Sequence, residues 1–213
     1  MPLTAAQLTF GYGERSLFRD LSLRVDRTDS VAIVGPSGSG KTTLLGLLGG
    51  LIRPQFGVVT IDEPGFTHVQ AGVSWVLQTM NVLPHRSVVD NVALGALSEG
   101  LDYVSARERA HEAIERLGIR HRAYRPIREL SGGEVQRTVI ARALVSGRPF
   151  ILADEPTGQL DRDNTELVVQ ALLRTRSDEQ GERRGLVIVT HDPAVAERCA
   201  TQLTVTDGGL SPA

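Results

Sequence analysis

The chain has 213 residues, of which 41% are hydrophobic and 23% charged, and its formal net charge at pH 7 is −2. This is the composition of an ordinary globular protein, and the length favours one domain with subdomains. The near-zero net charge argues against simple nucleic-acid binding. The single cysteine excludes an internal disulfide. The sequence shows no apolar run of membrane-spanning length and no signal peptide, so we expect a cytosolic chain.

The first third of the chain predicts short strands around a glycine-rich loop. Apolar and β-branched residues bounded by turn residues favour strands. A helix is expected at about 41–51, directly after the loop. The predicted strands lie at 8–10, 21–25, 31–35, 57–61 and 73–78.

Residues 87–147 have a helical pattern. Three serines are each followed three positions later by an acidic residue, as in a capping box: Ser87 with Asp90, Ser105 with Glu108, and Ser131 with Glu134. Beyond this region, strands and helices alternate, which is typical of a mostly parallel sheet covered by helices. Strands are predicted at 150–154, 186–190 and 202–206, and helices at 163–175 and 193–199.

The stretch "GPSGSGKT", which begins at Gly35, fits the phosphate-loop pattern G-x-x-x-x-G-K-[ST] between an apolar strand and a helix. Gly35, Gly38 and Gly40 let the backbone amides face a phosphate, and the helix N-terminus adds partial positive charge. Lys41, the only lysine of the chain, can reach the β- and γ-phosphates, and Thr42 can offer a hydroxyl to Mg²⁺. The motif therefore predicts a nucleoside triphosphate site.

A second candidate is the acidic pair that ends "FILADE". A buried strand delivers Asp154 and Glu155 to its carboxyl end, where α/β folds bind ligands. Asp154 would hold Mg²⁺, directly or through water, and Glu155 would orient or deprotonate the attacking water. Gln78 and His191 also follow strands; each can serve this chemistry, and each can equally be an ordinary polar residue at a strand end.

Together these motifs resemble the ATP-binding subunit of ABC transporters. Their order along the chain is the phosphate loop, a glutamine loop at Gln78, the signature "LSGGEVQR" at 130–137, "FILADE", the D-loop "GQLD" and a switch histidine at His191. The resemblance implies an α/β P-loop NTPase core of the RecA-like type, with a parallel-rich sheet. It also implies an antiparallel β subdomain and an inserted α-helical subdomain.

The resemblance also implies the composition of the ATP site. Catalytic roles fall to Glu155, His191 and Gln78, and Mg²⁺ ligands are Thr42, Gln78 and Asp154. Tyr12 would stack on adenine, with Phe10 as an alternative aromatic. The implied ATP-binding set is Tyr12, Gly35, Ser37, Gly38, Ser39, Gly40, Lys41, Thr42 and Thr43.

In this family two ATPase subunits pair head to tail around two ATP molecules. The resemblance implies that the signature residues Ser131, Gly132, Gly133 and Glu134 contact the ATP held by the partner, and that Asp161 of the D-loop crosses the interface. It implies a homodimer or pseudo-dimer that works beneath integral membrane subunits, on the inner face of the cell membrane and without nucleic acid.

The expected subdomains are a β part at about 1–30 and 55–70, a nucleotide-binding core at about 31–54, 71–80 and 147–213, and a helical part at about 81–146. Several stretches, including "LADEPTGQLD", resemble the lipoprotein-releasing, macrolide-export and division-associated branch. This favours export, extraction or force transmission. Two alternatives stay open: an ATP-switched regulator with a division-type membrane partner, and a soluble ATPase acting on DNA or ribosomes.

Overall fold

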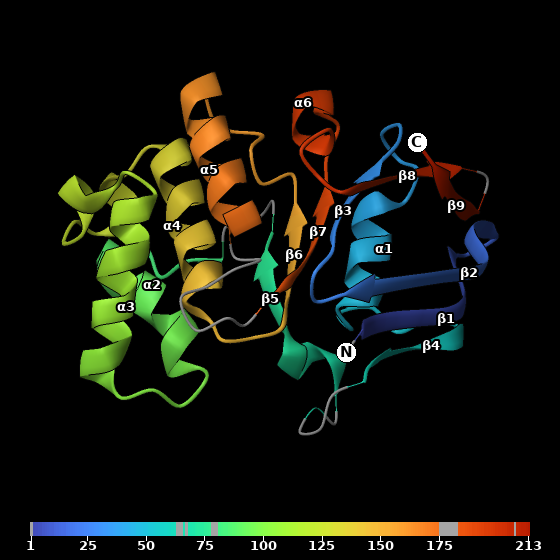
Figure 1. The fold of residues 1–213 in the computed structure, drawn as a ribbon, viewed down its shortest axis with the longest axis horizontal. Coiled ribbons are helices and arrows are strands. Elements are labelled where there is room, and N and C mark those ends of the chain that lie inside the picture. The colour runs from blue at the N-terminus through green and yellow to red at the C-terminus, as the bar shows by residue number, and fades with distance from the viewer. Residues whose placement is uncertain (1, 63–65, 67, 78–80, 175–182, 207) are drawn as a thin grey trace. The chain divides into compact units, whose positions relative to one another are not determined.

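The computed structural model describes residues 2–62, 66, 68–77, 81–174, 183–206 and 208–213. Its internal contacts divide the chain into two compact units. Unit 1 comprises residues 1–73, 148–155 and 176–213, and unit 2 comprises residues 74–147 and 156–175. The helices and strands of both units are labelled in Figure 1.

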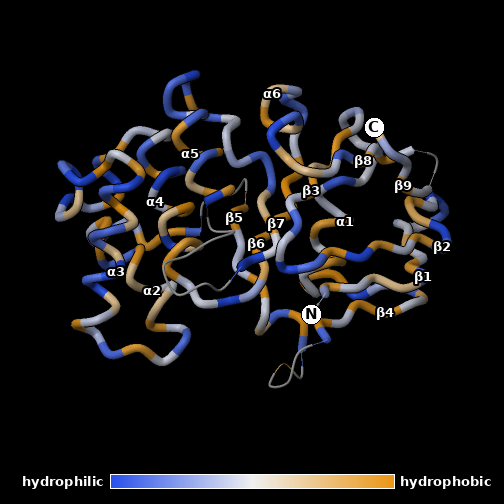
Figure 2. Tube along the Cα trace, viewed as in Figure 1, coloured by the Kyte–Doolittle hydropathy of each residue, from blue (hydrophilic) through white to orange (hydrophobic). Residues whose placement is uncertain are grey.

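The core of unit 1 is a mostly parallel sheet with the strand order β6-β7-β3-β8-β9. Strands β6, β7, β3 and β8 run parallel, and β9 is antiparallel to β8. Every residue of β6 and β7 is buried, which explains why both strands are apolar apart from Asp154 at the end of β6 (Figure 2). The bounds are β3 (Ser30–Val34), β6 (Phe150–Asp154), β7 (Gly185–Val189), β8 (Thr201–Thr206) and β9 (Gly209–Pro212).

Unit 1 also contains an antiparallel sheet with the order β2-β1-β4. Its strands are β1 (Pro2–Tyr12), β2 (Arg15–Asp26) and β4 (Phe56–Ile61). Helix α1 (Lys41–Leu48) contacts β6 and β7 of the parallel sheet and β1 of the antiparallel sheet. Helix α1 therefore packs against strands of both sheets. Two short elements complete the unit, the 3-10 helix η1 (Val69–Gly72) and α6 (Pro193–Ala196).

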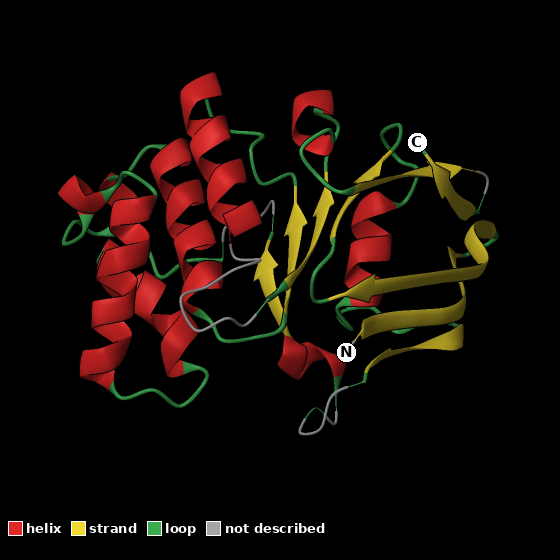
Figure 3. Cartoon of the chain, viewed as in Figure 1, coloured by secondary structure: helices red, strands yellow, loops and turns green. Residues whose placement is uncertain are grey.

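Unit 2 is built of helices that follow the end of β5 (Val73–Val76) (Figure 3). Helices α2, α3 and α4 pack against one another, and α4 also contacts α5. A Cβ atom on Gly95 would lie 2.2 Å from the Arg142 carbonyl oxygen, so this glycine allows α2 and α4 to approach closely. The bounds are α2 (Val88–Leu97), α3 (Tyr103–Arg116), α4 (Gly132–Val145) and α5 (Arg162–Arg174), with 3-10 helices η2 (Arg120–Arg122) and η3 (Ile127–Glu129).

The predicted α/β class is confirmed, with three differences in detail. Strands β1 and β2 are longer than predicted, and β9 was not predicted at all, since "GLSP" has no alternating pattern. The capping box expected at Ser105 is wrong: α3 begins earlier, and Asp102 is its N-cap and accepts from the amides of Val104 and Ser105. Within the described ranges, no helix is long and apolar enough to span a bilayer.

Candidate functional site

The turn between β3 and α1 holds the three glycines of the phosphate-loop motif. Gly35, Gly38 and Gly40 have φ angles of 147°, 78° and 100°, which residues with a side chain rarely adopt. A Cβ atom on Gly40 would also lie 3.0 Å from the Phe18 ring. The loop ends where α1 begins, at Lys41, so it leads directly to the first amides of a helix, which lack intrahelical acceptors.

The side chains of this loop are an ammonium and several hydroxyls. Lys41 Nζ donates to the carbonyl oxygens of Gly35 at 2.8 Å and Pro36 at 3.0 Å, so the ammonium lies over the loop. The hydroxyl of Ser39 is buried and has no hydrogen-bond partner among the described residues. The remaining hydroxyl side chains of the loop are those of Ser37 and Thr42, both exposed, and Thr43, half-buried.

Asp154 and Glu155 lie at the carboxyl end of β6, at the same edge of the sheet as the phosphate loop. Asp154 pairs with Val189 of β7, and Val189 pairs with Ile33 of β3, so the three strands end together. The Asp154 side chain accepts a hydrogen bond from Thr42, the last residue of the phosphate-loop motif. The structure thus brings together two motifs that are more than a hundred residues apart in sequence.

Asp154 is a buried acid with one carboxylate oxygen that accepts no hydrogen bond from the described residues. It is 3% exposed, and its Oδ1 has no hydrogen-bond partner within the described parts of the chain. Burial raises the pKa of this carboxyl, and the charge of Glu155 raises it further, while the hydrogen bond from Thr42 and the charge of Lys41 oppose the rise. An unpaired carboxylate oxygen at this depth is costly unless a cation binds it.

Glu155 has a strained backbone and a defined partner. Its φ angle of 48° is in the left-handed region, and its amide donates to the Val189 carbonyl at 2.9 Å. Its Oε1 lies 2.8 Å from Nδ1 of His191, whose side chain is 75% exposed. The contact places one carboxylate and one imidazole side by side just after the end of β6. Gln78, the other predicted catalytic residue, lies outside the described residues.

Tyr12 and Phe10, the two candidates for adenine stacking, differ clearly in exposure. Tyr12 ends β1 and is 57% exposed, whereas Phe10 is 9% exposed and belongs to the core. Their rings meet edge to face with centroids 5.0 Å apart. Of the two, only Tyr12 therefore offers a ring face to a ligand, and the buried Phe10 packs against its ring.

The signature stretch forms the start of α4 in unit 2. Ser131 is the N-cap: its hydroxyl accepts from the Glu134 amide at 3.3 Å, and its amide donates to Glu134 Oε2 at 2.9 Å. This is the predicted capping box. A Cβ atom on Gly132 would lie 2.7 Å from Oε1 of Gln159, so the lack of a side chain lets the D-loop approach the helix start.

Asp161 immediately precedes α5. Its Oδ1 accepts from the backbone amide of Asn164 and from the Asn164 side chain, both at 2.9 Å. These hydrogen bonds from the Asn164 amide and side chain lower the pKa of Asp161, so the residue is ionised at neutral pH. In this structure Asp161 therefore orders the D-loop at the start of α5.

Two arginines at these sites were not predicted from the sequence. Arg15 Nη2 donates to the carbonyl oxygen of Gly38 at 2.9 Å and so connects the β1–β2 hairpin to the phosphate loop. Arg122 Nε donates to Glu134 Oε1 at 2.8 Å. Neither lies in a motif, and the only sequence signal for Arg122 is its place shortly before a capping box.

The sequence matches the family described as "ABC transporter" over residues 18–158. The chain is 36% identical over 210 residues to the uncharacterized ABC transporter ATP-binding protein YvrO of Bacillus subtilis, which covers 94% of this chain and 90% of that protein. It is 38% identical over 200 residues to the lipoprotein-releasing system ATP-binding protein LolD of Shewanella sp. (strain MR-4), over 90% and 85% of the two chains.

Two solved structures of one protein are also similar to this chain. A dimeric structure of MJ0796, a bacterial ABC transporter cassette, has a TM-score of 0.85 and 30% identity over 98% of this chain and 96% of that one. A dimeric post-hydrolysis state of the same cassette, bound to ADP and Pi, has a TM-score of 0.84 and 30% identity over 99% and 98%. Motifs, fold and relatives agree, and we conclude that the chain belongs to the ABC transporter family as an ATP-binding subunit with ATPase activity.

Proposed function

We propose that this subunit hydrolyses ATP at the carboxyl edge of the parallel sheet, that it dimerises around two ATP molecules, and that it drives a separate membrane-spanning partner. One observation carries the proposal of the site. Asp154 Oδ1 is buried without a partner next to Thr42, while Glu155 and His191 face each other at 2.8 Å. The first feature would suit a metal ion bound to a triphosphate, and the second would suit an attacking water.

The phosphate loop would bind the triphosphate. Backbone amides of the loop and of the first turn of α1 would face the phosphate oxygens, and Lys41 would exchange its two loop carbonyls for the β- and γ-phosphates. The hydroxyls of Ser37, Ser39 and Thr43 are further donors in or next to the loop. Such donors are fixed before the reaction, so the binding energy can be used for positioning.

The residues at the end of β6 fit a divalent cation. Thr42 and Asp154 would hold Mg²⁺, because they offer a hydroxyl and an unpaired buried carboxylate oxygen, the hard oxygen ligands that Mg²⁺ prefers. Gln78 is a predicted third ligand. Bound there, Mg²⁺ would neutralise charge on the β- and γ-phosphate oxygens.

Glu155 and His191 would act on the water. The Glu155 carboxylate, which one imidazole nitrogen of His191 positions, can accept the proton of the attacking water. His191 would keep that carboxylate in place by donating from Nδ1, and a ring protonated on both nitrogens would also donate from Nε2 to the γ-phosphate. Tyr12 would stack on adenine, since its ring is exposed at the end of β1.

The dimer is proposed from the second helix start. The N-terminus of α4 in unit 2 is formed by Ser131, Gly132, Gly133 and Glu134. Helix N-termini bind anions, because their backbone amides are unpaired and carry partial positive charge. We propose that it contacts the γ-phosphate of ATP bound to a second copy, with Asp161 at the interface. The dimeric state of the MJ0796 structures supports this.

The Glu155→Gln variant tests the shared site. Gln keeps the shape of the side chain but cannot accept the proton, so ATP hydrolysis should stop while ATP and Mg²⁺ hold the chain as a dimer in analytical ultracentrifugation. A Glu155→Gln chain that stays monomeric with ATP and Mg²⁺ contradicts the shared site. Ser131→Arg is the companion variant, expected to bind ATP normally and to lose turnover.

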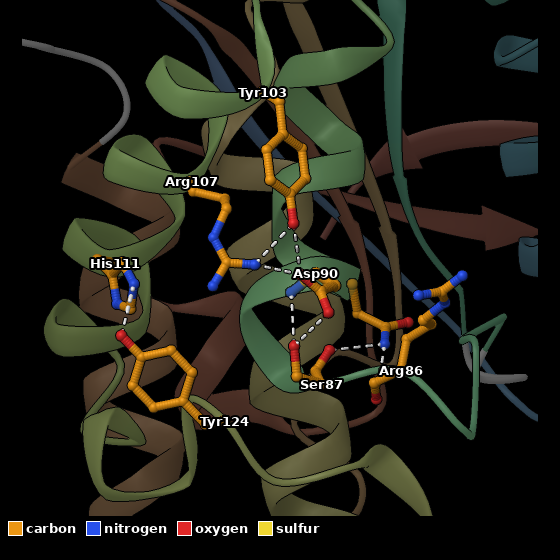
Figure 4. Close-up of polar contacts among 8 residues, drawn as sticks. Arg86, Ser87, Asp90, Tyr103, Arg107, His111 and Tyr124 are labelled. Carbon is orange, nitrogen blue, oxygen red and sulfur yellow. Dashed lines mark hydrogen bonds and ion pairs between the residues drawn. The ribbon is translucent and has the colours of Figure 1, made fainter.

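A partner-binding surface is proposed at the start of α2. Asp90 accepts from Ser87 Oγ at 2.6 Å and from Tyr103 at 3.4 Å, and it forms an ion pair with Arg107 (Figure 4). The buried Asn91 side chain binds both backbone polar groups of Leu83, at 2.7 and 3.1 Å. The segment is therefore rigid, yet it exposes apolar side chains.

Leu83, in the segment before α2, is 46% exposed. Tyr103, the first residue of α3, hydrogen-bonds to Asp90 of α2 and is 56% exposed. We propose that a helix of the membrane subunit packs there, which places the ATPase on the inner face of the cell membrane. In a reconstituted complex, Leu83→Ala should lower the ATPase stimulation by the membrane partner and leave the ATPase of the isolated subunit unchanged. The same variant in the absence of the partner is the control.

The nature of the partner is tested by purifying tagged Glu155→Gln from detergent-solubilised cells with ATP and Mg²⁺. An integral membrane protein in stoichiometric amount supports the transport or force-transmission role. A ribosomal, DNA-bound or soluble partner supports the alternative role outside transport. The resemblance to lipoprotein-releasing ATPases favours export or extraction.

A further inference from the structure

The carboxylate of Glu134 is held from two sides at the start of α4. Its Oε2 accepts from the amide of Ser131 at 2.9 Å and from the Ser131 hydroxyl at 3.1 Å. Its Oε1 accepts from Arg122 Nε at 2.8 Å and lies 3.6 Å from His121 Nε2. The Glu134 side chain is only 11% exposed, whereas those of Arg122 and His121 are 39% and 61% exposed.

This carboxylate is ionised at neutral pH. Burial alone would raise its pKa, but the hydrogen bonds from Ser131 and Arg122 outweigh burial and lower the pKa of Glu134 to about 2. A full negative charge therefore lies one hydrogen bond away from the Ser131 hydroxyl. Because like charges repel strongly where water is scarce, an uncompensated carboxylate here would oppose the approach of a triphosphate.

Arg122 is the cation placed to compensate that charge. It belongs to η2, and its guanidinium is the one described arginine group that hydrogen-bonds to Glu134. The neighbouring arginines are engaged elsewhere: Arg120 pairs with Glu115 at 2.7 Å, and Arg125 lies 3.6 Å from Glu129. On α4 itself, Arg137 acts on Asp161.

We propose that Arg122 is a positioning residue of the shared ATP site, because it neutralises and orients Glu134. Ser131 and the first amides of α4 can then donate hydrogen bonds to the triphosphate that is bound to a second copy of this chain. The inference rests on the proposed ATP-bridged dimer. In this role Arg122 contacts no nucleotide and no partner residue. It acts only through the charge and the orientation of Glu134.

The experiment compares Arg122→Ala, Arg122→Lys and Arg120→Ala in the Glu155→Gln background. The dimer dissociation constant with ATP and Mg²⁺ is measured by analytical ultracentrifugation, and ATP binding to the monomer by equilibrium dialysis at low protein concentration. Arg122→Ala should weaken the dimer at least about tenfold and leave monomer binding within about twofold, because the phosphate loop is unchanged. Arg122→Lys should recover part of the loss, and Arg120→Ala, the matched surface control, should change neither value.

A second comparison separates charge compensation from a general loss of structure. In a chain that also carries Glu134→Gln, the charge is absent, so Arg122→Ala should change the dimer dissociation constant less than about twofold. An equal loss in both backgrounds overturns the proposal, and so does an unchanged dimer in Arg122→Ala. If Arg122→Ala does not fold, Arg122→Gln replaces it in both backgrounds.

The outcomes also distinguish this inference from the proposed function. If Glu155→Gln itself stays monomeric with ATP and Mg²⁺, the ATP-bridged dimer is wrong and the role of Arg122 falls with it. If Glu155→Gln dimerises and the Arg122 variants dimerise equally well, the dimer stands and only the inference about Arg122 is wrong.

Discussion

Oε1 of Glu155 lies 2.8 Å from Nδ1 of His191, although the two residues follow different strands and are 36 positions apart. The contact exists because β6 and β7 are parallel neighbours that end at the same edge. It joins Glu155, whose backbone φ angle is 48°, to the imidazole of His191. The proposed roles of both residues depend on this pairing.

Removal of the imidazole should therefore slow the chemical step. In His191→Ala we expect kcat for ATP hydrolysis to fall about 100-fold, because the carboxylate that accepts the proton loses the imidazole that positions it, with KM for ATP within about threefold. Steady-state kinetics with saturating Mg²⁺ measure both values. His68→Ala removes an exposed histidine from unit 1 as the control, and a similar kcat in the two variants contradicts the role of His191.

The backbone of the phosphate loop should be intolerant of side chains. Gly40 has a φ of 100° and lies against Phe18, so Gly40→Ala should lower the free energy of unfolding by about 1–2 kcal/mol and weaken ATP binding. Urea unfolding and equilibrium dialysis measure the two effects. Gly147→Ala is the matched control, because an added Cβ there meets nothing within 4 Å; equal losses in both variants argue against the loop geometry.

Asp154 should limit stability in the absence of nucleotide. Its pKa is raised in the folded chain, chiefly by burial, so above that pKa the ionised carboxylate lowers the free energy of unfolding. Asp154→Asn should therefore raise the melting temperature at pH 7 by roughly 2 °C and reduce ATP turnover by at least about 100-fold. The exposed Asp62→Asn is the control, and a lower melting temperature in Asp154→Asn would contradict the burial argument.

Glu134 should contribute to stability with the opposite pH dependence. Its pKa is lowered from the ordinary value of 4.5 to about 2, so the contribution is complete above about pH 4.5 and is lost as the pH falls toward 2. The urea midpoints of the unmodified chain and of Glu134→Gln should differ most at pH 6–7 and converge below about pH 4.5. The exposed Glu115→Gln serves as control, and a gap that widens on acidification would refute the assignment.

The local parts of this protein could be predicted from its sequence. A few consecutive residues were enough to predict the phosphate loop and the buried strand before Asp154. Turn geometry and hydrophobic burial act over short distances along the chain, so both leave a local sequence pattern. The capping box at Ser131 was predicted for the same reason. The one at Ser105 was not correct, because Asp102 caps the helix first.

Other parts needed relationships that no local pattern contains. The exposure of Tyr12 against the burial of Phe10, the unpaired oxygen of Asp154 and the hydrogen bond from Arg122 to Glu134 all depend on which elements lie next to one another. The alternating strands and helices determined that a phosphate site and an acidic strand end would exist at one edge of a sheet. Only the tertiary structure decided which charges meet there, because hydrogen bonds and ion pairs depend on distance in space and not on separation along the chain.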